Sequence, residues 1–154
     1  MQALIGLGAN LGDPLAQLQA AVDGLAAGSE VPAVSTVYRT AAVGPPQADY
    51  LNAAVLVTTG ENPQDLLARC QRLEAAAGRD RTAEVRWGPR RLDLDLLMVE
   101  DLVHRGPRLR LPHPRLHQRA FALLPAAGLA PDWVHPLLGL PLVVLADEVG
   151  SSGV

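Results

Sequence analysis

The chain of 154 residues contains no lysine, because all 13 of its basic residues are arginine. This absence excludes a Walker-type phosphate loop, which requires a Gly-Lys-Ser/Thr sequence, and it excludes Schiff-base chemistry on a lysine. Any phosphate that this protein binds must therefore be held by arginine, histidine, backbone N–H groups or a metal ion.

Cysteine, aromatic residues and long apolar runs are also scarce. Aromatic residues make up 3% of the chain, and the single cysteine, Cys70, excludes an internal disulfide. One unpaired cysteine is typical of a reducing compartment. No run approaches the roughly 20 apolar residues that cross a bilayer, and residues 1–10 lack the basic start of a signal peptide. We therefore expect a cytoplasmic protein without a membrane segment.

The residues that are present predict one domain over residues 1–154, since this length builds one core and is short for two. The net charge of −3 is unevenly distributed, because ten of the 13 arginines lie in residues 79–119. A basic segment inside an acidic protein indicates local attraction for an anion. Nucleic acid also requires interleaved aromatic residues, and this segment has only Trp87, so no nucleic-acid partner is expected.

Apolar runs bounded by Gly, Pro and Asn predict five strands. They are expected at residues 2–8, 33–39, 51–59, 92–99 and 108–111. The glycines of G-L-G-A-N-L-G, residues 6–12, do not form a dinucleotide-binding fingerprint, because Leu11 stands at the third glycine position. We interpret Gly6, Gly8 and Gly12 as residues that let the chain turn tightly from strand to helix.

Start and stop signals predict helices between these strands. One is expected from Asp13 to Gly28 and another from Asn62 to Gly78. Their apolar stripes are expected to be Leu15, Leu18, Val22 and Leu25, and Leu66, Cys70, Leu73 and Ala77. A third helix is expected at 119–127, and no element is assigned beyond Pro131. The order indicates an α+β, ferredoxin-like fold, with helices packed on one face of an antiparallel sheet.

The strongest functional signal is R-W-G-P-R-R-L-D-L-D, residues 86–95. Side chains alternate along a strand, so the leucines point to the core while Asp93 and Asp95 share the opposite face, with Cα atoms roughly 6–7 Å apart. Like charges so close repel each other unless a cation lies between them, and Mg²⁺ typically binds one or two carboxylates together with phosphate oxygens. The pair therefore predicts a magnesium site.

The simpler interpretation of Asp93 and Asp95 is a half-exposed strand with acidic side chains facing the solvent. Arginines around this pair favour a functional site instead. They are Arg79, Arg81, Arg86, Arg90 and Arg91. Guanidinium groups beside two metal-binding carboxylates are what nucleoside triphosphate chemistry requires, because their planar donors match phosphate oxygens.

Two further segments carry candidate binding residues, although each alone is more often structural. Flanking prolines hold His113 in an extended segment, from which it and Arg119 can reach phosphate. A zinc pair of His113 and His117 lacks other ligands. Asn52 carries the donor and acceptor that read the edge of a heterocycle, and Tyr50 and Phe121 offer flat apolar faces to its ring.

Six segments occur in the same order in the 6-hydroxymethyl-7,8-dihydropterin pyrophosphokinase family, which the chain resembles from about residue 2 to about residue 136. They are G-L-G-A-N-L-G-D, Y-R-T-x-x-x-G-P, D-Y-L-N-A, Q-R-L-E, R-W-G-P-R-x-L-D-L-D and P-H-x-x-x-x-x-R-x-F. The resemblance implies a ferredoxin-like fold and transfer of pyrophosphate from ATP to 6-hydroxymethyl-7,8-dihydropterin. The products would be AMP and the pterin diphosphate, in folate biosynthesis.

The same resemblance implies roles for individual residues. Two Mg²⁺ ions are expected on Asp93 and Asp95, with Arg90 and His113 also in catalytic roles. The pterin pocket is expected to consist of Thr40, Val43, Tyr50, Asn52 and Phe121. The ATP site is expected to consist of Gln71, Glu74, Arg79, Trp87, Arg90, Arg108, His113 and Arg119. Residues 79–91 correspond to a loop that closes over the nucleotide, residues 137–154 form an extension without an assigned role, and we expect a monomer.

Two other classes remain open from the residues alone. A non-catalytic ferredoxin-like module that binds a nucleotide or a small effector would release no AMP. A different Mg²⁺-dependent phosphotransferase would form ADP. The identity of the nucleotide product distinguishes all three.

Overall fold

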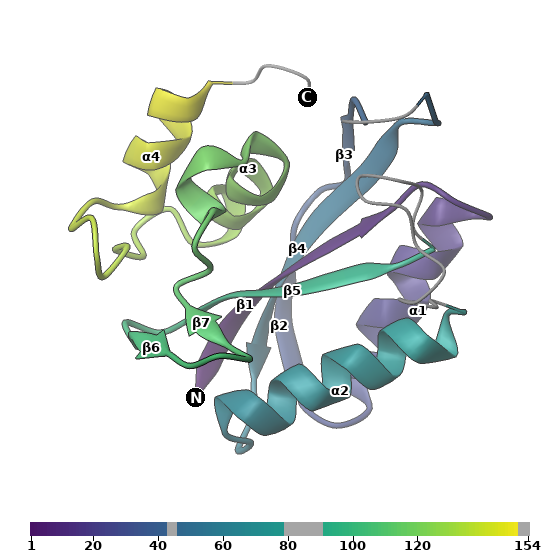
Figure 1. Cartoon of the computed structure of the whole chain (residues 1–154), viewed down its shortest axis with the longest axis horizontal. Helices are drawn as coiled ribbons and strands as arrows, with labels where there is room; N and C mark the ends of the chain where they lie inside the picture. The colour runs from purple at the N-terminus through teal and green to yellow at the C-terminus, as the bar shows by residue number, and fades with distance from the viewer. Residues whose placement is uncertain (43–45, 79–90, 151–154) are drawn as a thin grey trace.

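The computed structural model describes residues 1–42, 46–78 and 91–150 (Figure 1). Along the chain its elements are β1 (Gln2–Ala9), α1 (Pro14–Ala26), β2 (Glu30–Val34), β3 (Tyr38–Thr40), β4 (Tyr50–Thr58), α2 (Pro63–Ala76), β5 (Asp93–Val99), β6 (His104–Arg105), β7 (Arg110–Leu111), the 3-10 turn η1 (Leu116–Gln118), α3 (Ala120–Leu129) and α4 (Leu142–Val149). None of these described helices has the length and apolar character that crossing a bilayer requires.

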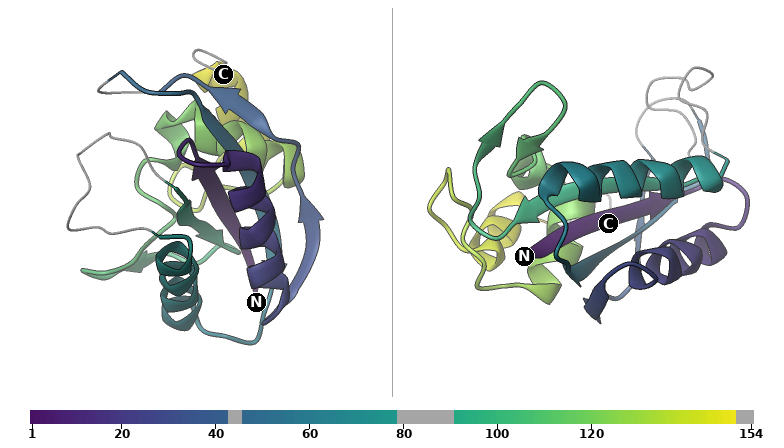
Figure 2. Two further views of the ribbon diagram at one scale, coloured as in Figure 1. Left: turned by 90° about the vertical axis from the view of Figure 1, so that its right-hand side faces the viewer. Right: turned by 90° about the horizontal axis from the view of Figure 1, so that it is seen from below.

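The main sheet is antiparallel, with strand order β2-β4-β1-β5 and β3 also paired with β4. Helices α1 and α2 pack on one face, as the sequence predicted, while α3 packs against the other face at one end of the sheet and α4 packs on α3 (Figures 1 and 2). The expected α+β, ferredoxin-like sheet is confirmed. The remainder of the second face carries no helix among the described residues.

β1 contributes to both faces, because successive side chains of a strand alternate. Ala3, Ile5 and Leu7 pack in the core beneath α1 and α2, and Leu4 packs in the second core beneath α3. The interpretation of Gly6 and Gly8 as turn residues is wrong, since both lie inside the strand. Gly12, with a φ of 75°, makes the turn.

The helix caps agree with the sequence prediction. The Asp13 carboxylate accepts a hydrogen bond from the Ala16 N–H at 3.2 Å, and the Asn62 Oδ1 accepts one from the Asp65 N–H at 2.9 Å. The predicted stripe of α1 is wrong at Leu15, which is 59% exposed. Contact with the sheet instead runs through buried residues of α1, namely Leu18, Ala21 and Leu25.

The prediction of one continuous strand at residues 33–39 is wrong, because the structure has two separate strands here, β2 and β3. The Ser35 hydroxyl accepts a hydrogen bond from the Ala54 N–H at 2.8 Å. A side-chain oxygen thus takes the place of a backbone carbonyl in the ladder, and the chain forms β2 before this point and β3 after it.

The C-terminal third contains elements that the sequence did not reveal. α3 was expected, and its apolar surface packs beneath α4, whose Leu142 and Leu145 complete the second core. A register shift opposite Leu4 and Ile5 lets consecutive residues Leu97 and Met98 of β5 both enter that core. Such a bulge reverses the strand's alternation without ending its pairing.

Candidate active site

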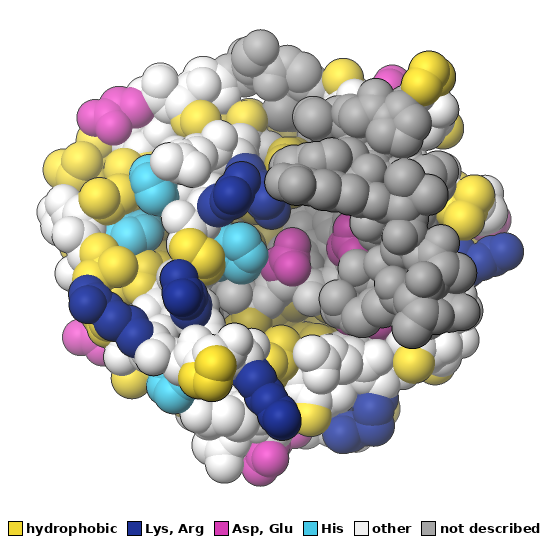
Figure 3. Space-filling view, viewed as in Figure 1, with side chains coloured by type: hydrophobic (Ala, Val, Ile, Leu, Met, Phe, Trp, Pro, Cys, Tyr) yellow, Lys and Arg dark blue, Asp and Glu magenta, His cyan; other side chains and the backbone are white. Residues whose placement is uncertain are grey.

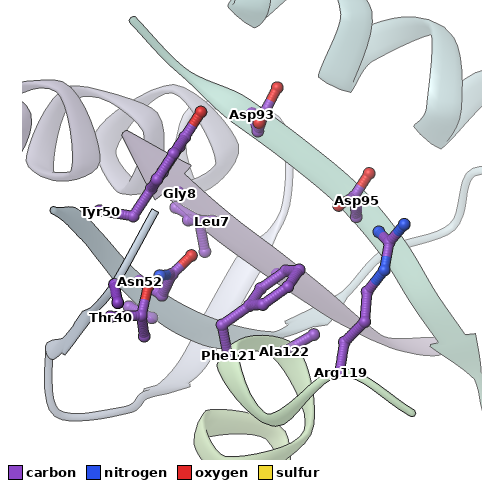
Figure 4. Close-up of a pocket in the computed structure, with 13 residues that line it drawn as sticks. Leu7, Gly8, Thr40, Tyr50, Asn52, Asp93, Asp95, Arg119, Phe121 and Ala122 are labelled. Atoms are coloured by element: carbon purple, nitrogen blue, oxygen red, sulfur yellow. Dashed lines mark hydrogen bonds between the residues drawn. The ribbon is translucent and has the colours of Figure 1, made fainter. Parts of the chain in front are cut away.

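Asp93 and Asp95 extend from the start of β5 on the face opposite α1 and α2. Leu94, between them, is 4% exposed and packs in the first core, whereas both aspartates are half-buried. Both carboxylates line one cavity of about 170 Å³, and Figure 4 shows them on the same side of the strand. The predicted common orientation of the two aspartates is confirmed.

This first cavity is bounded by β1, β3, β4, β5 and the start of α3 (Figure 4). Its lining is Gly6, Leu7, Gly8, Thr40, Ala41, Tyr50, Asn52, Ala53, Asp93, Asp95, Arg119, Phe121 and Ala122. The structure therefore brings together four of the five residues expected at the pterin, namely Thr40, Tyr50, Asn52 and Phe121. The fifth, Val43, lies outside the described residues.

Asn52 and Thr40 form the polar wall of the first cavity. The Asn52 Nδ2 donates a hydrogen bond to the Thr40 Oγ1 at 2.6 Å, and the two residues are 6% and 4% exposed. β3 pairs with β4 so that Thr40 lies opposite Tyr50, which brings the hydroxyl within reach of the amide. This bond fixes the orientation of the Asn52 side chain, and its Oδ1 lies beside Gly8 of β1.

Aromatic side chains form two other walls. Tyr50 enters from β4, and Phe121 enters from the first turn of α3 (Figure 4). The Arg119 guanidinium carbon lies 5.6 Å from the Phe121 ring centroid, within the range of a cation–π contact. Arg119, expected at ATP, thus lies at the first cavity.

A second hollow of about 260 Å³ lies along the outer edge of β5. Three residues expected at ATP line it, namely Gln71, Arg108 and His113. Asp95 lines both hollows and is their common wall. In Figure 3, acidic side chains lie within a hollow of this face that is flanked on one side by histidine and arginine side chains.

The geometry around His113 selects one tautomer. Its backbone N–H donates to the Leu97 carbonyl at 2.8 Å, and its Nδ1 accepts from the Arg115 N–H at 3.2 Å. Burial lowers the pKa of His113, the nearby arginines lower it further, and Asp95 opposes the shift. A neutral ring whose Nδ1 accepts a hydrogen bond carries its proton on Nε2, which makes Nε2 a donor.

Glu74 occupies a different environment from the other residues expected at ATP. It is 2% exposed, and its Oε2 accepts a hydrogen bond from the Leu94 N–H at 3.0 Å. It follows Leu66 and Cys70 at intervals of four, so helical periodicity places all three on the buried stripe of α2. The structure thus places Glu74 behind the strand that carries the aspartates, and its role at ATP stays a prediction.

Three other residues of the expected ATP site, Arg79, Trp87 and Arg90, lie outside the described residues. The site also contains residues that sequence reasoning missed. Arg110 lines the second hollow together with Arg108, and their spacing of two, typical of one face of a strand, was the available signal.

Other candidate chemistry receives no support from the described residues. Burial raises the pKa of the Cys70 thiol to about 12, so it remains protonated and unreactive. His117 lies against His135, with ring centroids 5.8 Å apart. The described part of the chain contains no group of three or more side chains able to form a zinc site.

Comparison with known proteins gives one consistent result. The family model of 7,8-dihydro-6-hydroxymethylpterin-pyrophosphokinase matches residues 4–131. A Synechocystis 2-amino-4-hydroxy-6-hydroxymethyldihydropteridine pyrophosphokinase is 42% identical over 154 residues, covering 99% of this chain and 78% of the relative. The enzyme of that name from Methylorubrum extorquens is 47% identical over 136 residues, covering 86% of this chain and 85% of the relative.

Solved structures agree on the fold. A Plasmodium falciparum HPPK-DHPS structure with pteroate matches 96% of this chain with a TM-score of 0.74 at 14% identity. A second HPPK-DHPS structure, in complex with substrates, matches 96% with a TM-score of 0.70 at 10% identity. This chain spans 42% and 43% of the length of those two chains. From the family model and the relatives together, the chain belongs to the 7,8-dihydro-6-hydroxymethylpterin-pyrophosphokinase family.

Proposed function

We propose that this chain transfers a pyrophosphoryl group from ATP to the hydroxyl group of 6-hydroxymethyl-7,8-dihydropterin, forming AMP and the pterin diphosphate of folate biosynthesis. Family membership supports the reaction. The chain acts as a single catalytic domain and a cytoplasmic monomer.

One observation carries the assignment of the site. Asp95 lies between a cavity lined by aromatic and amide side chains and a hollow lined by arginine and histidine. A reaction between a heterocyclic alcohol and a nucleoside triphosphate requires two such neighbouring sites, because the reacting atoms must approach to about 3–3.5 Å. The first cavity takes the pterin and the second takes ATP.

The first cavity suits a flat ring with polar edges. Tyr50 and Phe121 offer apolar faces to the ring. Asn52, oriented by Thr40, presents its amide to the hydrogen-bonding edge. Val43 joins these residues by the family pattern. Together they direct the hydroxymethyl group toward Asp93 and Asp95.

Asp93 and Asp95 hold magnesium in this proposal. Two half-buried carboxylates on one face fit Mg²⁺, which takes one or two carboxylates and completes its shell with phosphate oxygens and water. Because phosphate oxygens of the substrate would complete the coordination shell of Mg²⁺, the protein does not need to supply three or more ligands. Two Mg²⁺ ions bound at Asp93 and Asp95 would neutralise charge on the phosphate oxygens and would orient the triphosphate.

The remaining residues bind and neutralise ATP. Gln71 and Arg108 contact the nucleotide along the second hollow, and the Nε2–H of His113 donates to the α-phosphate as AMP departs. Arg119, beside Phe121, extends positive charge to the point where the two cavities meet. By the family pattern, Glu74, Arg79, Trp87 and Arg90 complete this site, and Arg90 neutralises the transferred group.

The reaction is an in-line displacement at the β-phosphorus. The pterin oxygen forms a bond to this phosphorus, the bond from it to the oxygen bridging the α-phosphate breaks, and the electron pair leaves with AMP. The proton of the hydroxyl group is released to the solvent as the new oxygen–phosphorus bond forms. The transition state is loose, so positioning and neutralisation of charge account for most of the acceleration. Exclusion of water from the filled site suppresses hydrolysis of ATP.

Identification of the nucleotide product tests this proposal. The protein is incubated with ATP, Mg²⁺ and 6-hydroxymethyl-7,8-dihydropterin, and the products are separated by anion-exchange chromatography. We expect AMP and the pterin diphosphate in equal amounts, with no product when Mg²⁺ is chelated. ADP in place of AMP would identify another phosphotransferase, and no turnover with retained nucleotide binding would identify a non-catalytic module.

A further inference from the structure

Gly8 lies inside β1, whose residues Gly6, Leu7 and Gly8 line the first cavity and are called its floor here. The strand register places it opposite Asn52 on one side and opposite Asp93 on the other. It therefore occupies the space between the amide expected to read the ring and the carboxylates expected to bind the metal.

A side chain at this position would collide with the recognition residue. A Cβ atom on Gly8 would lie 2.7 Å from the Asn52 Oδ1 and 3.8 Å from the Tyr50 Cδ1. A separation below 3.0 Å essentially never occurs for real Cβ atoms, so Asn52 would have to shift. The Asn52 oxygen occupies its position only because residue 8 has no side chain.

Asn52 has little freedom to shift without losing its other contact. It is 6% exposed, and its Nδ2 is bonded to the Thr40 hydroxyl at 2.6 Å. Rotation of the amide away from a new Cβ would break this bond or turn the Oδ1 out of the floor. Either change alters the pattern of donor and acceptor that the cavity presents to a heterocycle.

We infer that Gly8 is a specificity-determining residue: its missing side chain seats the Asn52 Oδ1 at the cavity floor, where it accepts a hydrogen bond from an N–H edge of a flat heterocyclic substrate. This inference rests on the proposed function. Gly8 acts through Asn52 as a positioning residue, and its effect falls on ring recognition rather than on ATP.

Gly6 shows that the effect belongs to Gly8 and not to every glycine of this strand. Gly6 lies on the same face, two residues earlier, and a Cβ there would meet the Leu97 Cδ1 at 3.3 Å. This atom is the far end of a flexible apolar side chain, which can yield by a rotamer change. The conflict at Gly8 instead involves a buried amide in a hydrogen bond.

The test compares Gly8→Ala with Gly60→Ala. Gly60 lies in the turn before α2, outside both cavities, and a Cβ there would meet nothing within 4 Å. For each variant, KM for both substrates is measured, together with equilibrium binding of 6-hydroxymethylpterin by its own fluorescence and Tm. We expect Gly8→Ala to weaken pterin binding by about tenfold or more, as loss of a buried hydrogen bond does. KM for ATP should change by less than about twofold, and Gly60→Ala should match the wild type in every measurement.

A double-variant cycle isolates the contact with Asn52. Gly8→Ala is repeated in an Asn52→Ala background, where the clashing oxygen is absent, and it should then weaken pterin binding by less than about twofold. Equal losses in both backgrounds, unchanged pterin binding in Gly8→Ala, or parallel losses for pterin and ATP would overturn the inference. If Gly8→Ala does not fold, the double variant should fold, and failure of the double variant to fold would likewise contradict a role through Asn52.

Absence of AMP from the wild type would refute the proposed reaction, while the binding titration would still report on Gly8.

Discussion

The two faces of the sheet are built by the same strands and differ in composition. Toward α1 and α2, β1 and β5 present a continuous apolar surface that includes Ile5, Leu7 and Leu94, each at most 4% exposed. Toward the other face, the same strands present Gly8 and Asp95 beyond the part covered by α3. Because neighbouring residues of a strand face opposite ways, the face toward α1 and α2 stabilises the fold, while the part of the other face outside the second core carries the residues proposed for the chemistry. Substitutions on the two faces should therefore have separable effects.

The largest expected effect is on the chemical face. Asp95→Ala should reduce turnover by about a thousandfold, because it removes one of the two carboxylates proposed to hold the magnesium that would neutralise and position the phosphates. Tm should change little, since Asp95 is half-buried and outside both apolar cores. AMP formation and thermal unfolding measure the two quantities, with the exposed Asp101→Ala as the control. Near-normal turnover would show that Asp95 does not bind the metal.

The next largest effect is on the apolar face. Leu66 of α2 is fully buried, so Leu66→Ala should lower the free energy of unfolding by about 2–5 kcal/mol through lost burial and a residual cavity. Leu15→Ala is the matched control: this leucine, also on a helix of that face, is 59% exposed, and the change should stay within about 0.5 kcal/mol. Urea unfolding measures both variants. Equal costs would contradict the difference in burial between the two leucines.

A smaller effect is expected where α1 meets α2. Arg69 donates to the Glu61 carboxylate at 2.8 Å, to the Leu25 carbonyl at 3.0 Å and to the Ser29 hydroxyl at 2.9 Å. Arg69→Met should destabilise the protein by about 1–2 kcal/mol, mainly through the loss of these hydrogen bonds, because the Glu61 side chain is partly exposed and its ion pair is screened by water.

The same contact predicts a pH dependence. The Arg69 guanidinium lowers the pKa of Glu61 below its ordinary value of 4.5, so the pair stabilises the native state above that value. This contribution is lost as the pH falls below it. The free energy of unfolding of the wild type and of Arg69→Met is measured at pH 7 and below pH 4.5, and the difference between the two proteins should be smaller at the lower pH. For an Arg105→Met control, the difference from the wild type should not depend on pH.

The smallest effect concerns His135, which is buried in the segment between α3 and α4. Its Nδ1 accepts hydrogen bonds from the Leu137 and Leu138 N–H groups, and burial, with help from His117, lowers its pKa below 6.5. The native state therefore binds this proton less readily than the unfolded chain does, so the contribution is complete above about pH 6.5 and declines as the pH falls. The loss cannot exceed about 1.4 kcal/mol per pH unit. In His135→Asn the side-chain Oδ1 can still accept these hydrogen bonds but does not titrate. The free energy of unfolding of this variant should therefore depend less on pH between 7.5 and 5.5 than that of the wild type, and an equal dependence would contradict this.

Local physics made part of the fold predictable from the sequence. Asp13 and Asn62 identify the starts of α1 and α2 because a side-chain oxygen followed by proline satisfies the free N–H groups of a first turn. The alternation of Leu94 with Asp93 and Asp95 fixes their opposite directions in the same way. The candidate site followed from these positions together with the family pattern.

The features that escaped prediction depend on partners distant in the sequence. Ser35 divides a strand because its hydroxyl meets Ala54 of β4, and Gly8 is a floor residue because Asn52 lies across from it. Neither contact leaves a local signature. Glu74 differs, because its spacing from Leu66 and Cys70 already indicated the buried face of α2.

β5 is an edge strand of the main sheet. An outer strand with unpaired backbone groups can recruit a strand from another molecule and start aggregation. Here the Glu74 carboxylate occupies the Leu94 N–H, and the His113 N–H occupies the Leu97 carbonyl. These two contacts occupy backbone groups that an incoming strand would need, and they therefore oppose the addition of a further strand at this edge of the sheet.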